Sequence, residues 1–180
     1  MHHRAFMLQP QLPVDGLPAA AFFDEKYGGR EPRENVFARV AELGAAVGIA
    51  FDFASMPKAP HTGLAHRALL LYDGDCRQPR VLQGLYSACF EQGRDITDLR
   101  TVADVTSAAS GDEVGDVRDW LTRREAKARL DADILEARRL GLNAVPTVVA
   151  DGTIAVQGAQ PPSVVSRLVA QARELLLASA

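Results

Sequence analysis

Cysteine is scarce in this sequence, and its scarcity excludes several classes of site. The 180 residues include two cysteines, Cys76 and Cys89, and no Cys-x-x-Cys motif. Two cysteines cannot form the disulfide framework that is typical of small secreted domains. The chain is therefore expected to work in a reducing compartment, and the predicted location is the cytoplasm.

Long apolar runs and an excess of positive charge are also missing. The apolar run at residues 68–72 is far shorter than the roughly 18 residues of a membrane helix, and the first residues lack the apolar core of a signal peptide. A net charge of -3 gives no broad positive surface. Neither a membrane nor a nucleic acid is expected as a partner.

Several catalytic and ligand-binding motifs are absent as well. There is no glycine-rich phosphate-binding motif and no Gly-x-Ser-x-Gly nucleophile elbow. His2 and His3 would point to opposite faces of a strand, so they do not form one metal site. No metal is expected, and no cofactor other than glutathione, which belongs to one functional alternative.

What the sequence does contain is one domain's length of chain with a helical middle. A chain of this length buries roughly 70% of its unfolded surface. Residues 2–8 are expected to form a short strand, and Thr62 is expected to cap a helix. Helical spacing of apolar residues predicts helices at residues 18–29, 33–49, 62–72, 81–92, 98–109, 113–120 and 124–140.

The hydrophobic period changes after Leu140. Residues 147–150 and 153–157 are rich in β-branched side chains, and Asp151-Gly152 between them is a strong signal for a two-residue hairpin turn. Pro161 suits the first turn of a closing helix. The apolar face of that helix is expected to pack on the hairpin.

The chain resembles the DsbA family, and in particular its FrnE-like, or 2-hydroxychromene-2-carboxylate isomerase-like, branch. The Val145-Pro146-Thr147 step, the hairpin and the closing helix resemble the second half of a thioredoxin fold. The resemblance implies an α/β, thioredoxin-like fold of the DsbA type with a large all-helical insertion, in a mostly cytoplasmic family. The matching blocks are residues 4–16, 41–53, 60–71, 90–98 and 144–162.

The resemblance also implies domain boundaries. Residues 1–12 and 142–180 would form an incomplete thioredoxin-like core, and residues 13–141 would form the inserted helical domain. Family members begin with a strand, then a Cys-x-x-Cys or related nucleophile at a helix start, and only then the strand that matches residues 2–8. The N-terminal βα unit with its nucleophile is thus expected to be absent here, so catalytic residues stay unknown.

The missing first strand would lie between residues 2–8 and residues 147–150. Without it, both strands expose unpaired backbone groups, which is an aggregation hazard. Three alternatives are open: the gene product continues upstream of Met1, the two strands pair directly, or a second chain fills the gap. The third alternative makes a homodimer one of the expected states.

A substrate-binding site is implied at Val145, Pro146 and Thr147. An X-Pro bond is cis at a cost of only about 0.5–1 kcal/mol. In the family, the cis turn exposes backbone groups of the preceding residue, which pair with an extended thiol substrate by β-augmentation. His66 lies in a block resembling the family's helix start, where His61 replaces the usual asparagine. For His66 a structural and a substrate-binding role are both open.

The two cysteines have different interpretations. Cys89 shares an apolar helical face with Val81 and Leu85, and a core position is favoured. Cys76 lies in a polar loop next to Arg77, where a nearby cation would lower the pKa of a thiol. An incidental exposed cysteine is favoured over a reactive one, and nothing in the sequence supports a disulfide between Cys76 and Cys89.

Three functions are therefore compared. The first is a FrnE-like thiol-disulfide oxidoreductase, represented here without its Cys-x-x-Cys segment. The second is a glutathione-dependent isomerase or transferase of the kappa-class-like branch, binding glutathione near Val145 and Pro146. The third is a non-catalytic peptide-binding or dimerisation module. The expected partner is a thiol or disulfide protein, or a small thiol.

Overall fold

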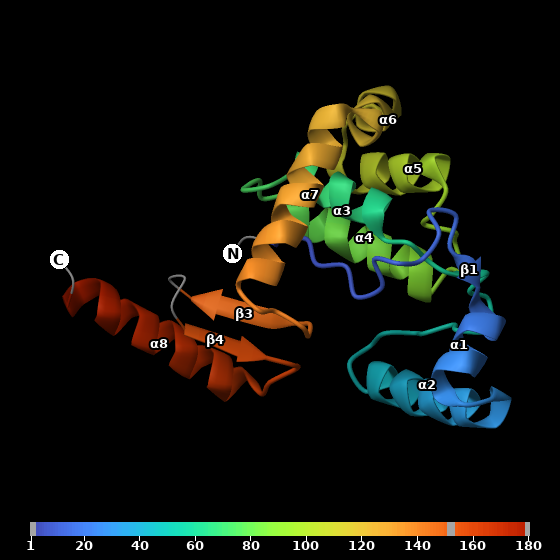
Figure 1. Ribbon diagram of the computed structural model, residues 1–180, viewed down its shortest axis with the longest axis horizontal. Coiled ribbons are helices and arrows are strands. Elements are labelled where there is room, and N and C mark those ends of the chain that lie inside the picture. The colour runs from blue at the N-terminus through green and yellow to red at the C-terminus, as the bar shows by residue number, and fades with distance from the viewer. Residues whose placement is uncertain (1–2, 151–153, 179–180) are drawn as a thin grey trace. The chain divides into compact units, whose positions relative to one another are not determined.

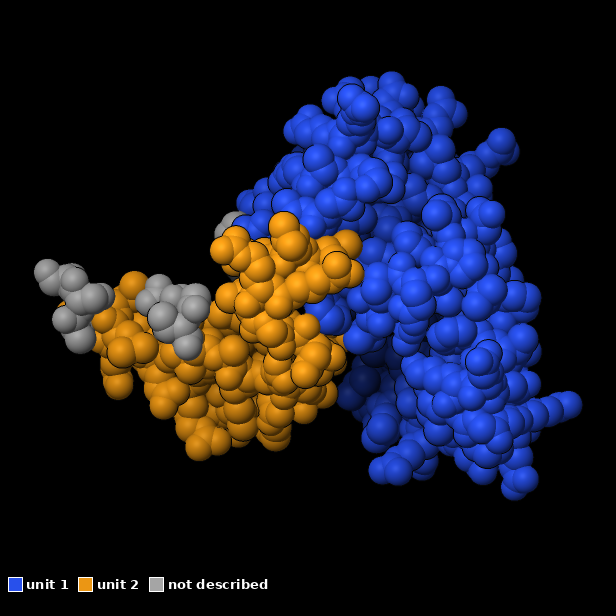
Figure 2. Space-filling view, viewed as in Figure 1, with its two compact units in different colours: residues 1–133 blue, residues 134–180 orange. Residues whose placement is uncertain are grey.

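A computed structural model describes residues 3–150 and 154–178. The chain divides into two compact units, residues 1–133 and 134–180, which are shown in blue and orange in Figure 2. Helix α7 (Arg124–Arg139) begins in unit 1 and ends in unit 2. Each unit has its own secondary structure and buried residues, and each is described by itself.

Unit 1 is built mainly from helices (Figure 1). Two very short strands, Leu17–Pro18 (β1) and Lys58–Ala59 (β2), pair antiparallel. A strand of two residues is too short to show an alternating pattern, so the sequence did not predict β1 and β2. The helices before α7 are α1 (Ala19–Tyr27), α2 (Arg30–Ala45), α3 (Gly63–Leu71), α4 (Gln78–Phe90), α5 (Leu99–Ser110) and α6 (Val114–Thr122).

The core of unit 1 lies among α3, α4, α5 and α6, which pack on one another. Val81, Val102, Val117 and Leu121 come from three of these helices, and each is fully buried. Burying such a side chain contributes about 1.5–3 kcal/mol relative to leaving it in water. The helical spacing of apolar residues thus predicted these helices.

Residues 3–7 do not form the expected strand. Their burial still alternates, since Ala5 and Met7 are buried and Arg4 is exposed. However, their backbone donors bond to side chains: the Ala5 N–H donates to Asp133 Oδ2 (3.0 Å) and the His3 N–H to Gln78 Oε1 (3.3 Å). The prediction of a strand was wrong because these donors meet carboxylate and amide oxygens instead of a neighbouring strand.

Residues 3–12 lie in unit 1 together with the helices. The division into a thioredoxin-like core of residues 1–12 and 142–180 and an inserted helical domain of residues 13–141 stays a prediction. Direct pairing of residues 2–8 with residues 147–150 stays a prediction, as do the other two ways of covering the sheet edge.

Unit 2 contains the expected hairpin and closing helix. Strands β3 (Thr147–Ala150) and β4 (Ile154–Gln157) pair antiparallel, with Thr147 opposite Gln157 and Ala150 opposite Ile154. The expected Asp151-Gly152 turn lies outside the described residues. Helix α8 (Pro162–Ala178) contacts both strands and buries Leu168 and Ala172.

Candidate functional site

The loop before β3 is held by two hydrogen bonds. The Val145–Pro146 peptide bond is cis. The Thr147 hydroxyl donates to the Ala144 carbonyl oxygen (2.7 Å), and the Gly158 N–H donates to the Pro146 carbonyl oxygen (2.8 Å). The loop is therefore fixed on both sides of Val145, by the residue before it and by the end of the hairpin.

Val145 is the part of this loop that is open to a ligand. Its side chain is 43% exposed, and in the described part of the chain its backbone N–H and C=O have no hydrogen-bond partner. An unpaired donor and acceptor on one exposed residue can pair with the backbone of an added strand. Val145, Pro146 and Thr147 thus lie together at the start of β3, as the sequence motif requires.

His66 lies in unit 1, on the first turn of α3, where its N–H donates to the Thr62 carbonyl oxygen (3.0 Å). Burial lowers the pKa of its imidazole, opposed by the backbone of Phe6 and the charge of Asp133. A histidine with a lowered pKa is neutral at neutral pH. Its surroundings join α3 to residues 4–6 and α7, which favours a structural role; a substrate-binding role stays a prediction.

The start of α3 is capped by a histidine. Thr62 occupies the N-cap position as expected, but its side chain makes no capping hydrogen bond. Instead, His61 Nδ1 accepts from the Gly63 N–H (3.4 Å). Burial, followed by the charge of Arg67, lowers the pKa of His61 and keeps the ring able to accept. Sequence reasoning missed this role, because serine, threonine, aspartate and asparagine are the usual caps.

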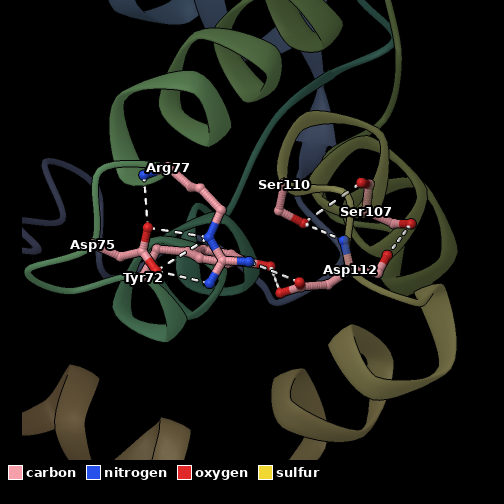
Figure 3. Close-up of polar contacts among 6 residues, drawn as sticks. All are labelled: Tyr72, Asp75, Arg77, Ser107, Ser110 and Asp112. Atoms are coloured by element: carbon pink, nitrogen blue, oxygen red, sulfur yellow. Dashed lines mark hydrogen bonds and ion pairs between the residues drawn. The ribbon is translucent and has the colours of Figure 1, made fainter.

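A polar cluster joins the loop before α4 to the end of α5, as Figure 3 shows. The Arg77 guanidinium donates to Asp75 (2.7 Å) and to Asp112 Oδ1 (2.7 Å). The Tyr72 hydroxyl donates to Asp112 Oδ2 (2.9 Å), so both oxygens of that carboxylate are used. Ser107 donates to the Asp112 carbonyl oxygen (2.7 Å). The cluster was not predicted, because residues 72–77 and 107–112 are distant in the sequence.

The charges of this cluster indicate a structural role, in which it holds the loop before α4 against the end of α5. Hydrogen bonds from Arg77 lower the pKa of Asp75 to about 2, and the Asp75 carboxylate raises the pKa of Arg77. Burial raises the pKa of Tyr72. All three groups therefore keep one protonation state near neutral pH, whereas a general acid or base needs a pKa near the operating pH.

Cys89 is not placed like a redox nucleophile. Cys89 is 2% exposed, and burial raises the pKa of its thiol to about 11. The core position predicted for it is confirmed. Cys76 is exposed, and both cysteines are free. The reactive form of cysteine is the thiolate, so Cys89 is inert while it stays buried.

The described ranges hold neither a metal cluster nor a membrane-spanning helix. Residues 3–150 and 154–178 contain no group of three or more His, Cys, Asp or Glu that could hold a metal ion. Among those residues no helix is both long and apolar enough to span a bilayer. A cavity of about 580 Å³ in unit 1 is lined by Trp120 and by the carboxylates of Asp112, Glu113 and Asp116.

Comparison with known proteins places the fold. The model of the DsbA-like thioredoxin domain matches residues 1–170. The crystal structure of a probable DsbA oxidoreductase from Streptomyces coelicolor is similar, with a TM-score of 0.83 and 28% sequence identity, over 96% of this chain and 74% of that chain. No curated protein matches. The α/β thioredoxin-like fold with helical insertion, expected from the sequence, is confirmed, and the chain belongs to the DsbA-like thioredoxin domain family.

Proposed function

We propose that the chain is the substrate-holding part of a FrnE-like thiol-disulfide oxidoreductase. The observation that carries the proposal is Val145, which is 43% exposed and whose backbone lacks hydrogen-bond partners in the described chain. The 180 residues contain no Cys-x-x-Cys, so the proposal assigns them binding rather than the dithiol chemistry.

The proposed binding mode is β-augmentation. A substrate segment that contains a cysteine runs extended past Val145, and its backbone exchanges hydrogen bonds with the Val145 N–H and C=O. The bonds at Ala144 and Gly158 hold the loop in place, which lowers the conformational entropy lost on binding.

Thr147 provides the test within this loop. We expect Thr147→Val to weaken peptide binding several-fold, because it removes the hydroxyl bond to Ala144, worth about 0.5–1.5 kcal/mol. Amide chemical-shift titration with an extended cysteine peptide measures the affinity and should show the largest shifts at Val145 and Thr147. Thr122→Val, on α6, removes a comparable hydroxyl bond as a control. Equal affinities for the two variants would contradict the proposal.

Glutathione is the competing ligand, because its own peptide groups could pair with the same backbone atoms of Val145. The oxidoreductase proposal predicts that an extended cysteine peptide binds more tightly than glutathione, since it offers more backbone groups. A titration in which glutathione binds at Val145 and the peptide does not would favour the glutathione-dependent isomerase or transferase instead.

A further inference from the structure

The cavity in unit 1 runs along one face of helix α6. It has a volume of about 580 Å³, and its α6 side consists of Glu113, Asp116, Val117, Trp120 and Arg123. These residues are linked by steps of three or four along the chain, so they share one face of the helix. Glu113 is the N-cap and Arg123 the C-cap of α6, and the α6 cavity therefore extends over the length of the helix. Its volume lies within the roughly 300–1,000 Å³ of small-molecule sites.

The middle of the α6 cavity is apolar. Val117 is fully buried and Trp120 is 7% exposed, and Leu71, the last residue of α3, adds a third apolar side chain to the lining. The Trp120 ring is held in place because its Nε1–H donates to the Arg67 carbonyl oxygen (2.8 Å). A ligand with an apolar body therefore meets a fixed apolar surface.

The two ends of the α6 cavity carry opposite charges. Glu113 and Asp116 lie at the start of α6, and Arg123 lies at its end. All three residues are exposed, and within the described chain none of their side chains has an ion pair or a hydrogen bond. The fourth charged residue of the lining, Asp112, has both carboxylate oxygens engaged in the cluster of Figure 3. The cavity thus offers two free carboxylates at one end and a free guanidinium at the other.

This arrangement selects a ligand with an ammonium group at one end and a carboxylate at the other. Arg123 follows Asp116 by seven residues, which corresponds to about 10.5 Å along the helix axis. An extended peptide rises about 3.3–3.6 Å per residue, so three residues span this length. A purely cationic ligand would meet Arg123 as a like charge, and a purely anionic ligand would meet the two carboxylates.

We propose that the α6 cavity binds a short peptide of about three residues whose two termini are free. The ammonium group of the peptide pairs with Glu113 and Asp116, and its terminal carboxylate pairs with Arg123. Its apolar side chains contact Trp120 in the middle of the cavity. All the lining residues belong to unit 1, so the proposal does not depend on the one made for Val145.

Calorimetric titration of the full 180-residue chain with tri-alanine tests the proposal. The fluorescence of Trp120, the only tryptophan in the sequence, reports whether the peptide binds at the cavity. N-acetyl tri-alanine lacks the ammonium group, and tri-alanine amide lacks the carboxylate. We expect each blocked peptide to bind at least about fivefold more weakly than tri-alanine, because each loses one ion pair. Equal binding of the three peptides, or no binding of tri-alanine, would overturn the proposal.

Variants of α6 test which end of the cavity holds which terminus. Arg123→Gln should remove the difference between tri-alanine and its amide and keep the difference between tri-alanine and its N-acetyl form. The double variant Glu113→Gln with Asp116→Asn should do the reverse. Arg118→Gln and Asp119→Asn, at exposed positions of α6 outside the cavity lining, are the matched controls and should keep both differences. Circular dichroism checks that each variant keeps its fold. Folded variants that keep the difference they should lose would overturn the proposal.

Discussion

The surroundings of Cys76 and Cys89 determine what each thiol can do. Cys89 is enclosed by the core of unit 1, where burial disfavours the charged thiolate. Cys76 is exposed, on a short loop between Asp75 and Arg77. Of the two, only Cys76 can react readily with a reagent in solution.

Thiol labelling should therefore proceed in two phases. At pH 8 a thiol with a pKa of about 11 is ionised to roughly one part in a thousand. We expect a chromogenic disulfide reagent to modify one thiol of the native chain quickly and the second only after denaturation. Cys76→Ser should abolish the fast phase, and Cys89→Ala should keep it. A fast phase that survives Cys76→Ser would show that Cys89 is accessible.

The ion pair between Asp75 and Arg77 predicts a pH dependence of stability. The pKa of Asp75 in the folded chain is lowered from 3.8 to about 2, so the pair stabilises the fold above pH 4. This contribution is lost as the pH falls from about 4 to about 2. We expect Arg77→Gln to lower the melting temperature at pH 7 and to have little effect at pH 2. An effect of the same size at both pH values would contradict the assignment.

At the scale of the element, local capping explains where several helices start. Asp98 is the N-cap of α5, and its carboxylate accepts from the Thr101 N–H (2.9 Å). The helix was predicted over residues 98–109, and an aspartate before an apolar-periodic run is a start signal. At α3 the cap is His61, which no such signal predicts.

Removing the α5 cap should have a measurable cost. We expect Asp98→Ala to lower the free energy of unfolding by about 0.5–2 kcal/mol, because the first turn loses its acceptor. Asp104→Ala, at an exposed position inside the same helix, provides the control and should change it little. Urea unfolding followed by circular dichroism measures both. Equal losses would mean that helix propensity, and not the cap, decides.

At the scale of the whole molecule, the sequence predicted the helices and strands that depend on a local pattern of apolar residues. The helical periods located α1 to α7, and the β-branched runs at residues 147–157 located the hairpin. The same reasoning failed at residues 3–7, where burial alternates but the backbone donors bond to Asp133 and Gln78. Alternation predicts an extended chain, but it does not supply a partner strand.

Features that join distant segments could not be predicted from the sequence. Arg77 and Asp112 are 35 residues apart, and nothing in either loop predicts their ion pair. The proline loop was found because its three residues are consecutive in the chain. Its exposure and its unpaired backbone became visible only in the structure.

Core packing determines how much stability the molecule loses when a cavity is made in its interior. Leu121 is fully buried among the helices of unit 1, and we expect Leu121→Ala to cost about 2–5 kcal/mol. Leu140→Ala, at a residue that is 56% exposed, should cost much less. Thermal unfolding measures both, and similar losses would place Leu121 outside the core.

The central claim is that the Val145 backbone holds an extended thiol substrate. Calorimetric titration with a cysteine peptide tests it most directly, using one peptide N-methylated at the amide that faces Val145 and one methylated at the next amide, which points away. We predict that the first methylation weakens binding at least about tenfold and that the second leaves it nearly unchanged. Equal binding of the two methylated peptides, or no binding of the unmodified peptide, would contradict the account.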